Sequence, residues 1–250
     1  MKQLILPKDY SGEEIYTLPK EDSHYLLHVQ RKEIGYSLNL LDIDNNRYQG
    51  KLVKIEDNRC ILKLSKILND TGDNRKIILF QSIPKGKKID LMIRQAVETG
   101  VSIVVPIMAD HSIPTFKEAG DRKKKKERWN KIVKEASQQS GTNNITILDD
   151  LKTLKEALDG LSMPHTGLYF HQVPLKNRAL HQLLHSSEKT IVLVIGPEGG
   201  LSKREVDLLD SYNFSPVLLG KNILRAETAT TFSLGAVQMI LNEQDEWTLK

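Results

Sequence analysis

Polar and apolar residues alternate along much of the first 70 residues, the pattern of strands with one buried face. Asp44-Asn45-Asn46 is a good turn sequence, and a polar segment over residues 69–74 is the best domain boundary in the chain. The expected strands are Tyr36–Ile43, Arg47–Ile55 and Arg59–Leu64, with a short helix over Glu21–Val29. We therefore predict a small β-rich domain over residues 1–70.

Beyond residue 74, short apolar runs alternate with amphipathic segments. The predicted strands are Lys76–Ile83, Ser102–Ile107, Thr166–Phe170, Thr190–Ile195 and Phe214–Leu219. The predicted helices are Lys87–Thr99, Arg122–Gln139, Leu151–Leu158, Lys176–His185, Lys203–Asp210 and Glu227–Asn242. Gly100 and Gly141 stand where helices end, and Ser202 with Glu205 has the spacing of a capping box. Such alternation predicts a mostly parallel sheet with helices on both faces.

The composition is that of an ordinary globular protein, with 39% hydrophobic and 27% charged residues. No apolar stretch is long enough to span a bilayer, and residues 1–7 do not form a secretory leader. The single cysteine, Cys60, fits a reducing compartment and a buried position in a strand. We expect a cytoplasmic protein with no membrane partner.

Positive charge is concentrated in one predicted helix. Residues 121–135 hold eight basic and three acidic residues, an excess of five, whereas the whole chain carries +4. Such a patch suits a polyanion, although a solvated helix face would have the same composition.

Three predicted strand ends carry unusual residues: Phe170-His171-Gln172, Gly196-Pro197-Glu198-Gly199-Gly200, and Gly220-Lys221-Asn222-Ile223-Leu224-Arg225. Ligands of open α/β sheets bind beyond the carboxyl ends of the strands, so we expect these segments to meet. The glycine segment contains neither of the phosphate-binding motifs G-x-G-x-x-G and G-x-x-x-x-G-K-(S/T). In addition, Pro197 removes a backbone N–H, and Glu198 places negative charge where a phosphate would lie. The segment could bind a ligand without phosphates, such as S-adenosylmethionine, or simply form a tight turn.

The segments Ile195–Ser202 and Leu219–Ala229, with Glu205 between them, resemble the 16S ribosomal RNA uridine-N3 methyltransferase family. The resemblance extends over nearly the whole chain. Upstream it includes Lys85-Gly86, Glu98-Thr99-Gly100-Val101, Pro106, Arg128–Ile132, Glu135-Ala136 and Gln139-Ser140-Gly141, and in the first domain His24, His28-Val29, Arg31 and Gly35.

This resemblance implies an α/β fold of the SPOUT class, a parallel sheet whose C-terminal segment threads through a loop to form a trefoil knot. It also implies a PUA-like RNA-binding β-barrel over residues 1–70, a methyltransferase domain over residues 71–250, and a homodimer. The implied reaction is methylation of a uridine N3 in 16S rRNA of the small ribosomal subunit, with S-adenosylmethionine as methyl donor.

The expected site has three groups of residues. Arg225 is expected to hold the target nucleotide, unless it pairs with Glu198 or Glu227 instead. Glu198, Glu227 and His171 are candidate bases for the N3 proton; the alternative for Glu227 is to stabilise the start of a helix. The cofactor-binding residues are expected to be His171, Ile195, Gly196, Gly199, Gly200, Leu219, Gly220, Ile223 and Leu224. The RNA-binding residues are expected to be Arg31, Lys123, Lys124, Lys125, Lys126 and Arg128.

The pairs His24/His28 and His181/His185 lack a third ligand nearby, so no metal is expected. Gln3, Gln95, His111 and Thr142 stand where the family pattern usually has basic residues. The cofactor is therefore predicted more firmly than the RNA target, with Lys123 to Lys126 able to supply substitute contacts. The alternatives are a methyltransferase of the same class acting on another rRNA or tRNA nucleotide, and a non-catalytic RNA-binding protein of ribosome assembly.

Overall fold

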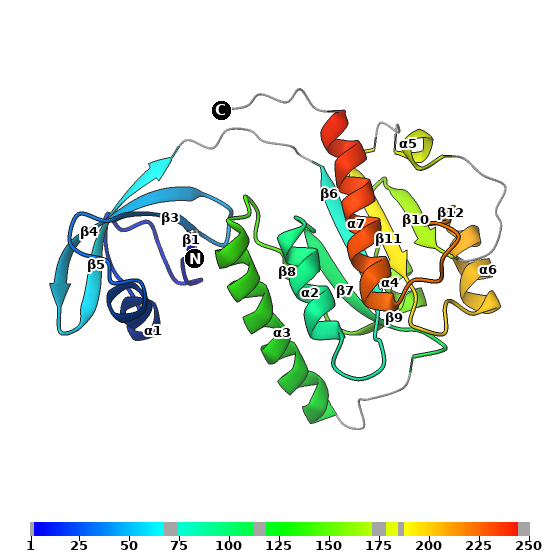
Figure 1. Cartoon of the computed structure of the whole chain (residues 1–250), viewed down its shortest axis with the longest axis horizontal. Helices are drawn as coiled ribbons and strands as arrows, with labels where there is room; N and C mark the ends of the chain where they lie inside the picture. Colours follow the sequence, from blue (N-terminus) through cyan, green and yellow to red (C-terminus); the bar gives the residue numbers. More distant parts are fainter. Residues whose placement is uncertain (1–2, 68–74, 113–118, 172–178, 185–187, 245–250) are drawn as a thin grey trace. The chain divides into compact units, whose positions relative to one another are not determined.

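The computed structural model describes residues 3–67, 75–112, 119–171, 179–184 and 188–244 (Figure 1). It divides into two compact units, residues 1–73 with 137–145 and residues 74–136 with 146–250. Residues 137–145 follow the predicted boundary in the sequence but belong to the first unit. Gln3 Nε2 donates to the carbonyls of Ser137 and Thr142 at 3.2 and 2.9 Å, and the Ile145 amide donates to Asn45 Oδ1 at 2.8 Å.

The first unit contains a five-stranded sheet in the order β1-β3-β4-β5-β2. The strands are β1 (Gln3–Ile5), β2 (Ile15–Thr17), β3 (Ser37–Leu41), β4 (Arg47–Glu56) and β5 (Arg59–Ile67). The predicted turn is present, with Asp42 Oδ1 accepting the amides of Asp44 and Asn46 at 2.9 and 2.8 Å. The predicted helix consists of α1 (Lys20–His24) continued by a π-helical turn (Tyr25–Val29). Cys60 is buried in this unit's leucine-rich core, as predicted.

The second unit contains a parallel sheet in the order β12-β10-β11-β6-β7-β8, with β9 also paired to β7. Its strands are β6 (Lys76–Ser82), β7 (Ile103–Met108), β8 (Ile147–Leu148), β9 (Lys152–Thr153), β10 (Thr166–Phe170), β11 (Thr190–Ile195) and β12 (Ser215–Val217). Its helices are α2 (Ile89–Glu98), α3 (Ala119–Ser140), α4 (Leu154–Asp159), α5 (Leu180–Leu183), α6 (Lys203–Ser211) and α7 (Ala226–Glu243). The predicted α/β class is confirmed, while the threading of the C-terminal segment stays a prediction.

Both faces of this sheet are covered by helices, which explains why its central strand β11 is buried along its whole length. Ile191, Leu193 and Ile195 face a core that includes residues of α2, α3 and α7. Val192 and Val194 face a second core with α4 and α6. Figure 1 shows α7 beside α2, and the two helices pack together. Among the described residues, no helix is both long and apolar enough to cross a bilayer.

The helix ends follow the local sequence signals in most places. Gly100 and Gly141 terminate α2 and α3 with φ of +80° and +71°, and the Ser202 capping box starts α6. The prediction of a helix over Leu151–Leu158 was wrong at its start, because Lys152 and Thr153 pair with β7 and Thr153 then caps α4. Of the helix predicted over Lys176–His185, the structure describes residues 179–184, which include α5. The two ends of the predicted helix lie outside the described residues.

Candidate active site

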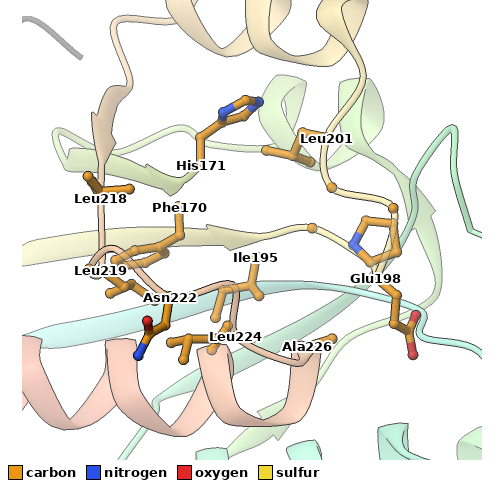
Figure 2. Close-up of a pocket in the computed structure, with 16 residues that line it drawn as sticks. Phe170, His171, Ile195, Glu198, Leu201, Leu218, Leu219, Asn222, Leu224 and Ala226 are labelled. Carbon is orange, nitrogen blue, oxygen red and sulfur yellow. The ribbon is translucent and has the colours of Figure 1, made fainter. Parts of the chain in front are cut away.

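The carboxyl ends of three neighbouring strands meet at one edge of the parallel sheet. Phe170 pairs in register with both Ile195 and Val217, and Ile195 pairs with Gln81. The segments after β10, β11 and β12 therefore emerge side by side, as predicted from the sequence. They surround a cavity of about 220 Å³ (Figure 2). Its lining consists of Phe170, His171, Ile195, Gly196, Pro197, Glu198, Gly199, Gly200, Leu201, Leu218, Leu219, Gly220, Asn222, Leu224, Ala226 and Ala229.

The glycine loop, residues 196–201, needs glycine for two different reasons. Gly200 has φ of +73°, a backbone conformation that costs other residues energy. Gly196 has no room for a side chain, because a Cβ there would lie 3.1 Å from Leu201 N and 3.2 Å from Gly200 C. The loop thus turns back on itself more tightly than side chains at these two positions would allow.

The segment between β12 and α7 forms another wall of the cavity. Leu219, Gly220 and Leu224 line it, and the first turn of α7 adds two small residues, Ala226 and Ala229. No backbone amide from Leu219 to Leu224 donates a hydrogen bond to a described residue. These amides and carbonyls are available to the edge of a planar heterocycle.

Ile223 differs from its neighbours in this wall. Its side chain is 79% exposed and does not line the cavity, whereas the adjacent Leu224 does. The geometry of the cavity therefore gives no support for a role of the Ile223 side chain in cofactor binding.

Glu198 and Glu227 share one cation, Lys88, which lies in the loop between β6 and α2. The Lys88 ammonium is 3.3 Å from Glu198 Oε1 and 3.2 Å from Glu227 Oε2. Glu198 Oε2 also accepts the Lys85 amide at 3.1 Å, and Figure 2 shows this carboxylate directed away from Phe170, Ile195 and Leu201.

Both carboxyls have pKa values below the ordinary range. Burial raises the pKa of Glu198, but hydrogen bonds from backbone amides and from Lys88 outweigh it. A hydrogen bond from its own amide and the charges of Lys88 and Arg225 lower the pKa of Glu227 against the effect of burial. Both groups are therefore charged at neutral pH and weak proton acceptors, which favours a positional role.

Arg225 is the residue immediately before α7, and its side chain is exposed. It does not line the cavity, although Leu224 and Ala226 on either side of it do. It forms no salt bridge with a described residue, so the alternative role, an ion pair with Glu198 or Glu227, is not present among the described contacts. Its guanidinium is thus available near the cavity.

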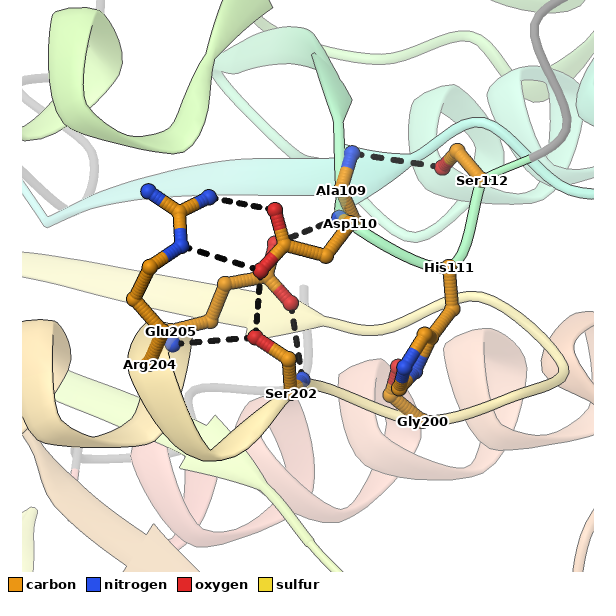
Figure 3. Close-up of polar contacts among 8 residues, drawn as sticks. All are labelled: Ala109, Asp110, His111, Ser112, Gly200, Ser202, Arg204 and Glu205. Atoms are coloured by element: carbon orange, nitrogen blue, oxygen red, sulfur yellow. Dashed lines mark hydrogen bonds and ion pairs between the residues drawn. The ribbon is translucent and has the colours of Figure 1, made fainter.

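A network of hydrogen bonds joins the segment after β7 to the glycine loop (Figure 3). The Asp110 carboxylate accepts from Ser202 Oγ at 2.5 Å and pairs with Arg204, while the Asp110 amide donates to the buried Glu205. His111 Nδ1 lies 3.1 Å from the carbonyls of both Gly199 and Gly200. A proton on this nitrogen would be donated to the glycine loop.

The other positions that depart from the family pattern have different surroundings. Gln3 and Thr142 contact each other within the first unit, where Gln3 Nε2 donates a hydrogen bond to the Thr142 carbonyl. Gln95 lies on α2, and its Oε1 is buried without a hydrogen-bond partner among the described residues. These three residues do not line the cavity.

The expected RNA-binding residues are distributed over both units. Arg31 is exposed in the first unit with φ of +54°. On α3, Lys126 pairs with Asp150 at 2.5 Å and Arg128 pairs with Asp90. Lys123 and Lys124 are exposed and form no ion pair with described residues, while Lys125 is half-buried. The neighbouring Trp129 is buried and packs α3 against the core.

Several residues of the site could not be assigned a role from the sequence. Lys88 had no local signal, because its partners Glu198 and Glu227 are distant in the chain. Phe170, Pro197, Leu201, Leu218 and Asn222 lay in or beside the expected segments without an assigned role, and all of them line the cavity. No group of three His, Cys, Asp or Glu side chains capable of holding a metal exists among the described residues.

Comparison with known proteins identifies the family. An RNA methyltransferase domain model matches residues 71–238, and an RNA methyltransferase PUA domain model matches residues 18–65. The chain is 30% identical to the ribosomal RNA small subunit methyltransferase E 2 of Borreliella burgdorferi, with 97% of this chain and 99% of the relative covered. It is 27% identical to ribosomal RNA small subunit methyltransferase E of Bacillus subtilis, with 89% of each covered.

A solved structure agrees with these relatives. Ribosomal RNA small subunit methyltransferase E from Neisseria gonorrhoeae, bound to S-adenosyl methionine, superposes with a TM-score of 0.79 at 28% identity. The match covers 96% of this chain and 98% of that one. The chain therefore belongs to the RNA methyltransferase family that includes the ribosomal RNA small subunit methyltransferases E.

Proposed function

We propose that this protein is an S-adenosylmethionine-dependent methyltransferase that modifies a base of small-subunit ribosomal RNA. The observation that carries the proposal is the cavity at the carboxyl ends of β10, β11 and β12. Its lining is mainly apolar and glycine-rich and includes no lysine or arginine among the described residues. Such a lining suits an adenosine without phosphates, and the Neisseria gonorrhoeae relative was solved with S-adenosyl methionine bound.

The residues present fit this cofactor. Gly200 and Gly220 line the cavity, and a Cβ at either would meet no described atom within 4 Å, so both glycines leave open space beside the backbone. Ile195, Leu219 and Leu224 supply apolar contact, and the unpaired backbone of residues 219–224 can hydrogen-bond an adenine edge. When bound, the cofactor supplies an electrophilic methyl group on a sulfonium cation.

The chain's own contribution is mainly to position the target base. A uridine N3 carries a proton that must leave before the nitrogen can act as a nucleophile. Arg225, exposed and without a salt bridge to the described residues, is placed to hold the nucleotide through a phosphate or base carbonyl. Orienting the base beside the donor supplies a large part of the rate in such a reaction. The proton acceptor is the neighbouring His171 or solvent, since Glu198 and Glu227 are held as charged partners of Lys88.

The RNA target is proposed from the relatives' names and from this chain's charge. The relatives are named for the small ribosomal subunit, and the family resemblance implies uridine N3 of 16S rRNA. Lys123 and Lys124 on α3 present positive charge with no ion pair to described residues, which suits a phosphate backbone. We also propose that the protein is cytoplasmic, where its rRNA substrate is found.

A homodimer is part of the same proposal. Phe232 and Met239 are 53% and 58% exposed and lie seven residues apart, on one face of α7. Ile223, at the entrance to the same helix, is 79% exposed. Apolar side chains of this size on a helix beside the cavity favour a second copy of the chain that completes the site. Sedimentation of the wild-type protein and of Phe232→Glu would test this, and a monomeric wild-type protein would rule it out.

The decisive experiment has a binding arm and a mapping arm. We expect calorimetry to show binding of S-adenosylmethionine, and mass-spectrometric mapping of rRNA from a deletion strain to show one methyl group missing and restored with the gene. Binding without a change in 16S rRNA would favour another rRNA or tRNA nucleotide. Absence of binding would favour the non-catalytic assembly protein.

Arg225 is tested within this scheme. Arg225→Ala should lose methylation by at least about a hundredfold, the typical effect of misplacing a substrate group, while keeping cofactor affinity. Arg225→Lys tests whether charge alone suffices. An Arg225→Ala protein with the full methylation rate would end the proposed role.

A further inference from the structure

The pairing of Lys88 with two carboxylates connects three parts of the chain that are separate in sequence. Lys88 lies in the loop between β6 and α2, Glu198 in the glycine loop and Glu227 in the first turn of α7. The glycine loop and the first turn of α7 both line the cavity. A single ammonium therefore joins two of the segments that form its wall.

Glu227 is the most buried of the three groups, which distinguishes this pairing from an ordinary surface contact. The side chains of Lys88, Glu198 and Glu227 are 37%, 35% and 19% exposed. Glu227 Oε2 is buried, has no directed hydrogen bond to a described residue, and has the Lys88 ammonium 3.2 Å away as its counter-charge. Without Lys88, two carboxylates would face each other at short range, one of them partly desolvated.

We propose that Lys88 is a positioning residue for cofactor binding, fixing the spacing between the glycine loop and the first turn of α7. This inference rests on the proposed function, since it assigns Lys88 to the same cofactor cavity. Lys88 acts through Glu198 and Glu227, and its side chain does not itself line the cavity.

Comparing two ligands distinguishes a positioning role of Lys88 from a direct effect of its charge on ligand binding. S-adenosylmethionine carries a sulfonium cation, whereas its demethylated product S-adenosylhomocysteine carries none and is otherwise nearly identical. The three side chains together carry one net negative charge, and removing the ammonium leaves two. A charge effect alone would improve binding of the sulfonium relative to the product, whereas a displaced wall weakens both ligands by the same factor.

The experiment compares Lys88→Met with Lys87→Met, using calorimetry of both ligands on the full-length protein. Lys87 is a matched control because it lies in the same loop, is exposed, and forms no ion pair with described residues. We expect Lys88→Met to weaken both ligands about tenfold or more and equally, as expected for a misplaced binding element. Lys88→Arg should recover most of the affinity, and Lys87→Met should bind like the wild type.

Every other outcome contradicts either the proposed function or the positioning role of Lys88. A wild-type protein that binds neither ligand overturns the proposed function itself. If the wild type binds and Lys88→Met binds both ligands as Lys87→Met does, the positioning role is wrong, even if Lys88→Met unfolds at lower temperature. Tighter relative binding of S-adenosylmethionine by Lys88→Met would show a charge effect in place of positioning. Should Lys88→Met fail to fold, Glu227→Gln, which removes one partner of the ammonium, must still weaken both ligands equally.

Discussion

Replacing Gly196 by alanine should weaken cofactor binding by crowding the glycine loop from within. The added Cβ would lie 3.1 Å from Leu201 N, 3.2 Å from Gly200 C and 3.2 Å from Leu201 Cγ. Two of these three neighbours are backbone atoms, which cannot turn away as a flexible side chain can. The backbone at residues 200–201 must therefore shift by a few tenths of an ångström, and this backbone lines the cavity.

The size of the effect follows from the cost of overpacking, about 1 to 3 kcal/mol. If this cost appears fully in binding, the dissociation constant for S-adenosylmethionine rises about 5- to 150-fold, since about 1.4 kcal/mol corresponds to a factor of ten. Any part that the free protein retains will appear instead as a lower free energy of unfolding. Calorimetry and urea denaturation of the same sample therefore measure the whole effect between them.

Gly86→Ala and Gly200→Ala add a methyl group without crowding, and Gly86→Ala, which lies outside the cavity lining, is the control for binding. Both glycines have positive φ, +77° and +73°, and a Cβ at either would meet no atom within 4 Å. Each should cost about 1 to 2 kcal/mol of backbone strain, but only Gly200 lines the cavity. If Gly196→Ala binds the cofactor within twofold of the wild type and unfolds at the same urea concentration, the close approach of backbone at Gly196 has no energetic consequence and our reasoning about the loop fails.

Three further predictions concern the loops around the site and the first unit. Ser202→Ala should destabilise the protein by about 1 to 3 kcal/mol, because it removes both the cap of α6 and the bond to Asp110; Ser202→Asp, which can cap but repels Asp110, should recover only part of this in urea denaturation. His111→Phe should raise the dissociation constant for S-adenosylmethionine about fivefold, the equivalent of about one hydrogen bond, and an unchanged affinity would show that the bonds to the glycine loop are dispensable. Burial raises the pKa of Asp42, but hydrogen bonds from Asn46, Tyr48 and Asp44 outweigh this effect, so that the pKa in the folded protein is below the ordinary value. Because the pKa of Asp42 is lower in the folded than in the unfolded protein, the charged carboxylate stabilises the fold fully above the ordinary aspartate pKa of about 3.9, and this stabilisation is lost as pH falls through the folded value. The urea midpoints of the wild type and Asp42→Asn should therefore converge in acid.

Much of the fold can be predicted from the sequence wherever a local signal specifies an element. Ile191–Ile195 is apolar on both faces, and β11 has the predicted bounds, Thr190–Ile195. The capping box at Ser202 likewise gives the start of α6. The strands that were missed, β1, β2, β8 and β9, are two or three residues long. They exist because of partners elsewhere in the chain, and residues this few carry no periodicity of their own.

The candidate site was predictable in outline for a similar reason. Parallel strands place their carboxyl ends together, so the residues after β10, β11 and β12 could be grouped before any coordinates were known. The directions of individual side chains could not. Ile223 and Leu224 are adjacent apolar residues, yet only Leu224 lines the cavity. The Lys88 contacts depend on where α7 begins relative to β6, which is a property of the assembled sheet.

The assignment of residues 137–145 to the first unit limits how this protein can be divided for experiments. The helix α3 begins in one compact unit and its last residues belong to the other. A fragment cut at residue 74 would keep Ser137, Thr142 and Ile145 but lose Gln3 and Asn45, to which they are hydrogen-bonded. Dissection of RNA binding from methyl transfer is therefore better attempted by point substitution than by expressing the two halves separately.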